Sequence, residues 1–163
     1  MVTWAEFMAA APDLAAEGRR LIYRNGEGDA LLATVREGDP PRIHPISVGI
    51  VDDRLYAFIT PSPKRRDLAT DGRYALHTHQ DPAAPREFSV RGRAVLIDAV
   101  DVRSAVASAW SFEPDETYDL FEFSIESALL GIRDGPDEWP PRYSSWTAAP
   151  AARFARDEPR TDS

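Results

Sequence analysis

Residues 55–68 read LYAFITPSPKRRDL, and this stretch predicts a buried strand followed directly by a short helix. Its apolar first half is typical of a strand, which we expect over residues 54–60. Ser62 is a favourable N-cap and Pro63 suits the first position of a helix. The sequence therefore predicts a helix from residue 63 to about residue 70.

The first turn of this helix carries Lys64, Arg65 and Arg66. The N-terminus of a helix is the positive end of its dipole, so each cation there costs roughly 0.3–1 kcal/mol. A bound anion would offset this cost, because free backbone N–H groups, the Ser62 hydroxyl and the basic side chains can together hold a phosphate. A solvated basic helix start, or an ion pair with one of the 27 acidic residues, are the alternatives.

The segments around this stretch read mostly as strands joined by turns. Residues 42–51 alternate in polarity and are expected to form a hairpin with residues 54–60. Gly92 lies inside a long predicted strand and indicates a bulge or a close backbone approach. Helices are expected within residues 3–24 and over 101–110. Further strands are expected at 30–35, 73–79, 87–97, 118–125 and 128–133.

Six or seven strands separated mainly by turns predict a mainly β (α+β) barrel, not a doubly wound parallel sheet. A chain of 163 residues is long enough for one domain with a core. We expect that domain over residues 1–148, followed by a flexible tail at 149–163. Within it we expect a helical segment at 3–24, the barrel at about 30–133 and an aromatic segment at 136–147.

Composition excludes several classes of function. The net charge of -8 argues against binding nucleic acid through its phosphates. The chain has no cysteine, which excludes disulfides, thiolate metal sites and a cysteine nucleophile. We find neither a signal peptide nor an apolar run near the roughly 20 residues that span a bilayer, so we expect a cytoplasmic protein without membrane contact.

Three pieces in order resemble the pyridoxamine-phosphate oxidase-like split-barrel superfamily. They are the strand that ends in Thr60, the helix start with Ser62 and Lys64, and the strand DGRYALH at residues 71–77. The segment PRIHPI at residues 41–46 resembles the preceding strand of the family, which lines the ring of the cofactor. The resemblance covers about residues 30–132. It implies a six-stranded split β-barrel with short flanking helices.

The resemblance also implies a homodimer with two cofactor sites at its interface. Members of the family bind FMN, a deazaflavin analogue or sometimes haem, and FMN is our first expectation. By the matched positions, the phosphate would lie near Thr60, Ser62, Lys64 and Arg65. The ring would lie along His44, Pro45, Ile46 and Ser47, with His77 and His79 on the strand beside it.

The function implied is an FMN- or deazaflavin-dependent oxidoreductase that acts on a small organic substrate. The sequence does not name catalytic residues, although Arg36, Arg42 or His77 could place a cation near the reduced ring. The chain lacks the arginine-rich C-terminal signature of true pyridoxamine-phosphate oxidases, so we do not expect oxidation of vitamin B6. The alternatives are a non-catalytic module that stores or senses a flavin or haem, and a dimeric barrel without a cofactor.

Two groups of residues leave their roles open. Three histidines could ligate a metal, but no carboxylate or cysteine with supporting spacing accompanies them, so no metal site is predicted. Binding of a haem through one axial histidine is a better-supported alternative than such a metal site. The aromatic residues Trp139, Tyr143 and Trp146 could cover a ring, pack across a dimer, or pack on their own barrel.

Overall fold

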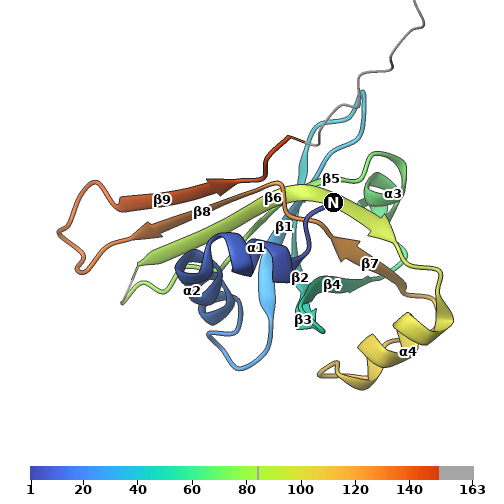
Figure 1. The fold of residues 1–163 in the computed structure, drawn as a ribbon. Helices are drawn as coiled ribbons and strands as arrows, with labels where there is room; N and C mark the ends of the chain where they lie inside the picture. Colours follow the sequence, from blue (N-terminus) through green and yellow to red (C-terminus); the bar gives the residue numbers. More distant parts are fainter. Residues whose placement is uncertain (84, 151–163) are drawn as a thin grey trace, which may run out of the picture.

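Nine strands form one antiparallel sheet that is curled into a half-barrel (Figure 1). The structure is a computed structural model and describes residues 1–83 and 85–150. The sheet order is β2-β1-β5-β6-β7-β4-β3, and β8 adds to β6 and carries β9. The strands are β1 (Asp29–Thr34), β2 (Arg42–Ser47), β3 (Gly49–Val51), β4 (Arg54–Ile59), β5 (Arg73–His77), β6 (Arg86–Leu96), β7 (Asp119–Phe123), β8 (Ser127–Ile132) and β9 (Arg142–Thr147).

The long strand β6 joins the two parts of the sheet. Its first half pairs with β5 and β8, and its last residues pair with β7. Gly92 lies where the partners change, and a Cβ there would be only 1.9 Å from the carbonyl oxygen of Ser124. The close backbone approach predicted at Gly92 is confirmed, and only glycine fits it.

Two strand predictions are corrected. The continuous strand expected over 42–51 is two strands, because β2 pairs with β1 whereas β3 pairs with β4, so only residues 49–51 form the hairpin expected with residues 54–60. The aromatic segment at 136–147 contains strand β9, which pairs with β8. Nine strands therefore replace the six or seven expected. Of the tail expected at 149–163, residues 151–163 lie outside the described residues.

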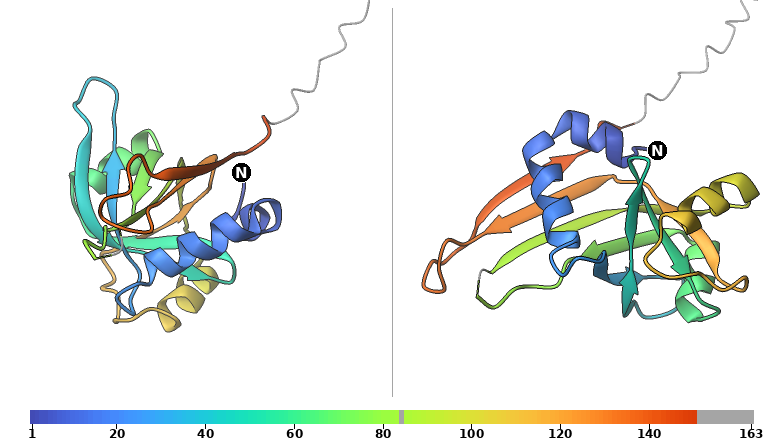
Figure 2. Two further views of the ribbon diagram at one scale, coloured as in Figure 1. Left: turned by 90° about the vertical axis from the view of Figure 1, so that its left-hand side faces the viewer. Right: turned by 90° about the horizontal axis from the view of Figure 1, so that it is seen from below.

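Two of the helices cover one side of the sheet. The helices are α1 (Trp4–Ala10), α2 (Pro12–Ile22), α3 (Pro63–Thr70) and α4 (Val100–Ser108). A capping box between Thr3 and Glu6 begins α1, as its spacing predicts. Helices α1 and α2 pack against the sheet (Figure 2), and the fully buried Phe7 lies 5.1 Å from Trp146, ring centre to ring centre. Trp146 thus packs on its own barrel.

Helix α4 lies at the other end of the molecule, beside β4 and β7 (Figure 1). It covers a second, smaller cluster of buried side chains, formed by Tyr56, Phe58, Val106 and Leu120. Within the described residues, no helix combines the length and the apolar character needed to cross a membrane.

Candidate functional site

The helix that the sequence singled out begins as predicted. The Ser62 hydroxyl accepts a hydrogen bond from the backbone N–H of Arg65 at 3.4 Å and donates one to the carbonyl oxygen of Thr60 at 2.8 Å. Pro63 occupies the first turn, which contains no acidic residue. The end of β4 is therefore tied to the basic N-terminus of α3, with Lys64 and Arg65 presented from its first turn.

Strand β2 brings two further basic side chains to this helix. Arg42 pairs with Thr34 of β1, and His44 pairs with Leu32. Both partners are buried, so Arg42 and His44 lie on the inner side of β2, where α3 also packs. Ile43 lies on the opposite side and is 69% exposed. The alternation of β2 therefore places Arg42 and His44, but not Ile43, on the side of Lys64.

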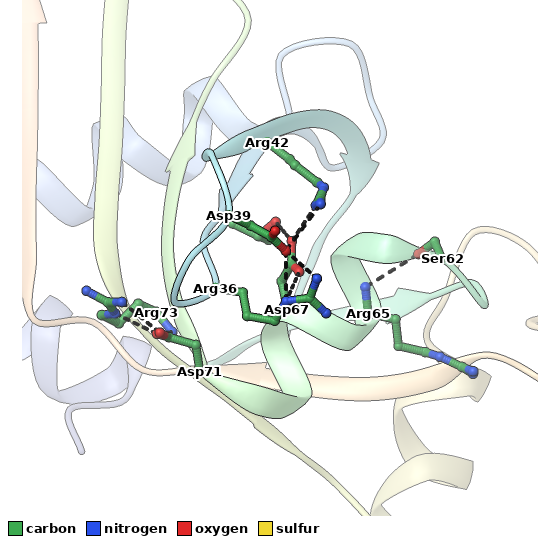
Figure 3. Close-up of polar contacts among 9 residues, drawn as sticks. Arg36, Asp39, Arg42, Ser62, Arg65, Asp67, Asp71 and Arg73 are labelled. Carbon is green, nitrogen blue, oxygen red and sulfur yellow. Dashed lines mark hydrogen bonds and ion pairs between the residues drawn. The ribbon is translucent and has the colours of Figure 1, made fainter.

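A buried carboxylate lies among these cations. Asp67 is 2% exposed, and the Thr34 hydroxyl donates to its Oδ2 at 2.9 Å. Arg42 Nη1 lies 3.6 Å from Oδ2, and Arg36 Nε lies 3.9 Å from Oδ1. Arg36 also hydrogen-bonds Asp39, and Figure 3 shows both arginines turned toward the two aspartates. We call Arg36, Arg42, His44 and Lys64, grouped around Asp67, the basic cluster.

The basic cluster contains buried polar atoms that lack a hydrogen bond. Among the described residues, Arg42 Nη1, His44 Nε2 and Asp67 Oδ1 are buried and make no hydrogen bond. Unpaired buried polar atoms are uncommon and costly, so they mark places where a ligand can bind. A phosphate offers three acceptor oxygens, which suit the two nitrogen atoms and the nearby Lys64 ammonium.

The electrostatics of His44 follow from the same surroundings. Burial, and then the charges of Lys64 and Arg42, lower its pKa below the usual value of 6.5, although Asp67 acts in the opposite direction. The lowered pKa favours the neutral imidazole at pH 7. An anion that neutralised Lys64 and Arg42 would remove the part of this lowering that their charges cause, but not the part caused by burial.

Arg65 turns away from the basic cluster. Figure 3 shows its side chain pointing away from Arg36 and Arg42. Its guanidinium donates to the carbonyl oxygen of Thr117 at 3.1 Å and lies 3.5 Å from the Asp119 carboxylate. A separate recess of about 460 Å³ lies on this side of the helix, lined by Ser62, Arg65 and Asp119 among others. The structure therefore groups Lys64 with β2 and groups Arg65 with the start of β7.

The residues expected along the ring are divided between the two faces of the sheet. His44 and Ile46 lie on the inner side of β2, whereas Pro45 and Ser47 lie on its exposed side. His77 shares the exposed side, because it pairs with Leu31 of β1. The ring position stays a prediction, and the sheet offers it two different surfaces.

His77 has polar partners of its own. Its Nδ1 lies 2.6 Å from the carbonyl oxygen of Thr78, and its Nε2 lies 3.5 Å from the Glu87 carboxylate. His79 is half-buried two residues further along. Within residues 1–83 and 85–150, no three histidine or acidic side chains come together as a metal site.

Sequence reasoning considered Arg42 only as a cation near the ring, not near the phosphate, and did not consider Asp67. Arg42 could have been found from the period of two in β2, which places it on the same face as His44. Asp67 carries no such signal. It lies three residues after Lys64 on α3, and only the packing of α3 against Thr34 shows that its carboxylate is buried.

The chain was compared with family models, curated proteins and solved structures, and only the solved structures are similar to it. No family model and no curated protein matches the chain. Solved structures do match. A haem-binding protein from Mycobacterium smegmatis superposes with a TM-score of 0.59 at 18% identity over 81% of this chain, which spans only 57% of that protein. A FAD-binding protein from Mesorhizobium loti gives 0.52 at 20% identity, covering 71% of this chain and 92% of that one.

A candidate pyridoxamine 5'-phosphate oxidase from Listeria innocua gives a TM-score of 0.53 at 14% identity, covering 69% of this chain and 94% of that one. The chain thus has the fold of the pyridoxamine-phosphate oxidase-like split barrels, and the expected resemblance is confirmed at the level of the fold. At these identities the likeness concerns architecture.

Proposed function

We propose that this protein binds a flavin, FMN in the first place, and acts as an oxidoreductase on a small organic substrate. The observation that carries the proposal is the pair of buried nitrogens without a hydrogen bond, Arg42 Nη1 and His44 Nε2, in the basic cluster. Arg42, His44 and Lys64 would hold the phosphate, together with the Ser62 cap at the N-terminus of α3. FMN and its deazaflavin analogue share this anchor.

A bound flavin would supply the electron transfer itself, while the protein holds and orients it. Of the three residues considered for a cation near the ring, two already have contacts elsewhere. Arg36 is engaged with Asp39, and Arg42 belongs to the basic cluster. His77 lies on the exposed side of the sheet and is the remaining candidate for a contact with the ring.

We also propose that a second copy of the chain covers the exposed side of the sheet. There β2, β1, β5, β6 and β8 present one continuous surface, which we call the outer face. Ile43 is 69% and Leu129 is 37% exposed on it. Apolar side chains suit the buried centre of an interface between two copies. The residues that define the outer face include Leu31, Ile43, Pro45, Ala75, His77, Ser89 and Leu129, and the same register places the charged Glu87 and Arg91 on it.

The outer face also has room for a ligand. A recess of about 510 Å³ lies between β6, β8 and β9, lined by Ser89, Arg91, Leu129 and Ser145 among others. This volume is in the range of small-molecule sites. Two copies that met on this face would enclose the recess, which supports a cofactor ring held between them.

The cofactor can be identified by anaerobic titration with FMN, the deazaflavin coenzyme and haem, followed by absorbance and fluorescence. We expect FMN or its analogue to bind saturably. Lys64→Ala should weaken that binding strongly, whereas Arg65→Ala should weaken it less, because Arg65 is turned toward Thr117 and Asp119. If no flavin bound the wild-type protein, the proposal would be rejected.

A second candidate function is a non-catalytic haem-binding module for storage or sensing. His44 favours it, because its buried Nε2 lacks a partner and an imidazole nitrogen can serve as an axial ligand. Nearby Arg42 and Lys64 would suit haem carboxylates. A Soret band that appears on titration with haem and is lost in His44→Ala would support this candidate over the flavin.

A further inference from the structure

Three titratable side chains meet on the outer face, from strands β5, β6 and β9. His77 pairs with Ser89, so it lies diagonal to Glu87 on the same side of the sheet. Glu87 pairs with Gly131, and Gly131 pairs in turn with Tyr143. Directly opposed residues share a face, so Glu87 and Tyr143 flank Gly131. We call His77, Glu87 and Tyr143 the acid–base triad.

Gly131 lets two members of the triad approach each other. A Cβ at this position would lie 2.8 Å from Glu87 Oε1 and 2.9 Å from a ring carbon of Tyr143. A side chain there would therefore have to displace the carboxylate or the phenol. The second carboxylate oxygen, Glu87 Oε2, lies 3.5 Å from His77 Nε2. Glu87 thus directs one oxygen toward His77 and the other toward the space that it shares with Tyr143.

The hydrogen bond of His77 decides which of its nitrogens can exchange a proton with Glu87. Nδ1 lies 2.6 Å from the carbonyl oxygen of Thr78, which can only accept. In the neutral ring the hydrogen is therefore on Nδ1, and Nε2 carries a lone pair. A lone pair that faces a carboxylate is unfavourable, so a proton between Nε2 and Glu87 is favoured. Nε2 is thus the nitrogen that gains and loses a proton.

Tyr143 forms the solvent-side end of the triad and is 54% exposed. Glu87 raises the pKa of the Tyr143 phenol, chiefly through a hydrogen bond, and burial acts in the same direction, whereas the charge of Arg133 opposes them. The phenol therefore keeps its proton at neutral pH and serves as a donor to Glu87. Glu87, Tyr143 and Arg133 line a recess of about 240 Å³ on this side of the triad.

The other end of the triad borders the larger recess between β6, β8 and β9. His77 pairs with Ser89, which lines that recess of about 510 Å³. The proposed second copy of the chain would enclose it, and enclosure expels water. A proton required inside the recess would then have to come from a side chain. The triad connects this recess with the exposed recess beside Tyr143.

We propose that the acid–base triad is a proton relay for a substrate that is reduced in the enclosed recess. A reduced flavin supplies two electrons and one proton as hydride, so a substrate that takes up two hydrogens needs one further proton. His77 Nε2 donates that proton and regains one from Glu87 Oε2, while the Tyr143 hydroxyl donates to Oε1 and is reprotonated by solvent. The electrons balance between flavin and substrate, and the solvent proton is the only other reactant. The donor role rests on the proposed function, whereas the coupling of the three groups does not.

NMR titration of the His77 ring tests the coupling without any cofactor. Glu87→Gln removes the negative charge beside Nε2, so the ring should become protonated only at lower pH. Tyr143→Phe removes the hydrogen bond that disperses the charge of Glu87, so the ring should become protonated at higher pH. Gly131→Ala, which separates Glu87 from Tyr143, should shift the titration in the same direction as Tyr143→Phe.

Tyr118→Phe is the matched control for this titration, because Tyr118 packs in the second cluster of buried side chains, beside α4. We expect it to leave the His77 titration unchanged. The opposite shifts in Glu87→Gln and Tyr143→Phe are the signature of a chain of three groups. A His77 titration that was the same in Tyr143→Phe as in the wild-type protein would overturn the relay.

Two oxidants of reduced, protein-bound FMN test the supply of the proton. 1,4-Benzoquinone takes up two electrons and two protons to become hydroquinone, whereas ferricyanide takes up electrons alone. The ratio of the reoxidation rate with benzoquinone to that with ferricyanide should fall roughly a hundredfold in His77→Gln, the usual contribution of a general acid. It should fall less in Tyr143→Phe and stay at the wild-type value in Tyr118→Phe. An unchanged ratio in His77→Gln would overturn the donor role.

The two experiments keep the relay apart from the proposed function. If no FMN binds, the proposed function and the donor role fail together, and the His77 titration alone decides whether the three groups are coupled. If FMN binds but Tyr143→Phe leaves the His77 titration unchanged, the relay is rejected and the proposed function stands.

Discussion

At the scale of single residues, Asp67 organises the basic cluster. A buried carboxylate is costly unless it is paired, and Asp67 obtains a hydrogen bond from Thr34 and the nearby charges of Arg36 and Arg42. The Asp67 carboxylate in turn attracts the Arg42 guanidinium and holds it close to α3. We infer that Asp67 is a positioning residue that holds Arg42 beside Lys64.

Asp67→Asn removes this charge while keeping the size of the side chain. We expect the free energy of unfolding to fall by about 2 kcal/mol, the typical contribution of a hydrogen bond to a charged group. Urea unfolding followed by circular dichroism measures the change. Asp98→Asn is the control, since Asp98 is exposed. Equal losses in the two variants would show that Asp67 has no special role.

His44 makes ligand binding depend on pH. Its pKa is lowered by burial and by Lys64 and Arg42, so a bound phosphate that neutralises these cations should raise it. The bound state then takes up a proton as the pH falls, and FMN should bind more tightly below neutral pH. NMR titration of the His44 ring with and without FMN checks the direction, and His44→Gln should remove the dependence.

At the scale of elements, helix α3 shows what local sequence can predict. Its bounds, Pro63–Thr70, match the expectation, because the Ser62 cap and the proline define its start. Gly72 then adopts a positive φ of 78°, which glycine tolerates at little cost. These signals come from neighbouring residues in the sequence. The three basic residues in the first turn, which indicated an anion site, are a local signal of the same kind.

The elements that were mispredicted depend on distant partners. Residues 42–51 divide because β2 pairs with β1 and β3 pairs with β4, and alternation within the segment cannot show this change of partner. Strand β9 forms because β8 offers an edge, whereas its own sequence is aromatic and proline-flanked. Arg65 likewise turns toward Thr117 because of a partner that is distant in the sequence. The sequence thus indicated the candidate site, and tertiary contacts decide which cations lie together in it.

The contact between α2 and β6 makes a separate prediction at this scale. Arg20 and Arg86 hydrogen-bond Glu17 and lower the pKa of its carboxyl to about 2. Because this pKa is lowered, the stabilisation is present above the unfolded value near 4.5 and is lost as the pH falls toward 2. Glu17→Gln should cost about 1 kcal/mol at pH 7, after allowance for solvent screening, and almost nothing at pH 2.

Urea unfolding at several pH values measures this difference. Glu116→Gln serves as the control, because Glu116 lies in an exposed loop. A loss in Glu17→Gln that stayed constant between pH 7 and pH 2 would mean that packing, and not the ion pair, holds α2 on the sheet.

At the scale of the whole molecule, we propose that two copies of the chain meet through the outer face. Leu129→Arg would place a charge in the proposed interface, and a buried unpaired charge is strongly unfavourable. We expect this variant to sediment as a monomer while the wild-type protein sediments as a dimer. Val100→Asp, on the distant helix α4, should leave the dimer intact. A wild-type monomer at micromolar concentration would contradict the proposal.

The central claim is that the basic cluster holds the phosphate of a flavin. The most direct measurement compares the dissociation constants of FMN and riboflavin, which differ only by the phosphate, for the wild-type protein, Lys64→Gln and the control Arg133→Gln. We expect the wild-type protein and the control to prefer FMN. In Lys64→Gln the affinity for FMN should fall roughly tenfold or more, with riboflavin unchanged. Equal binding of FMN and riboflavin by the wild-type protein would contradict the account.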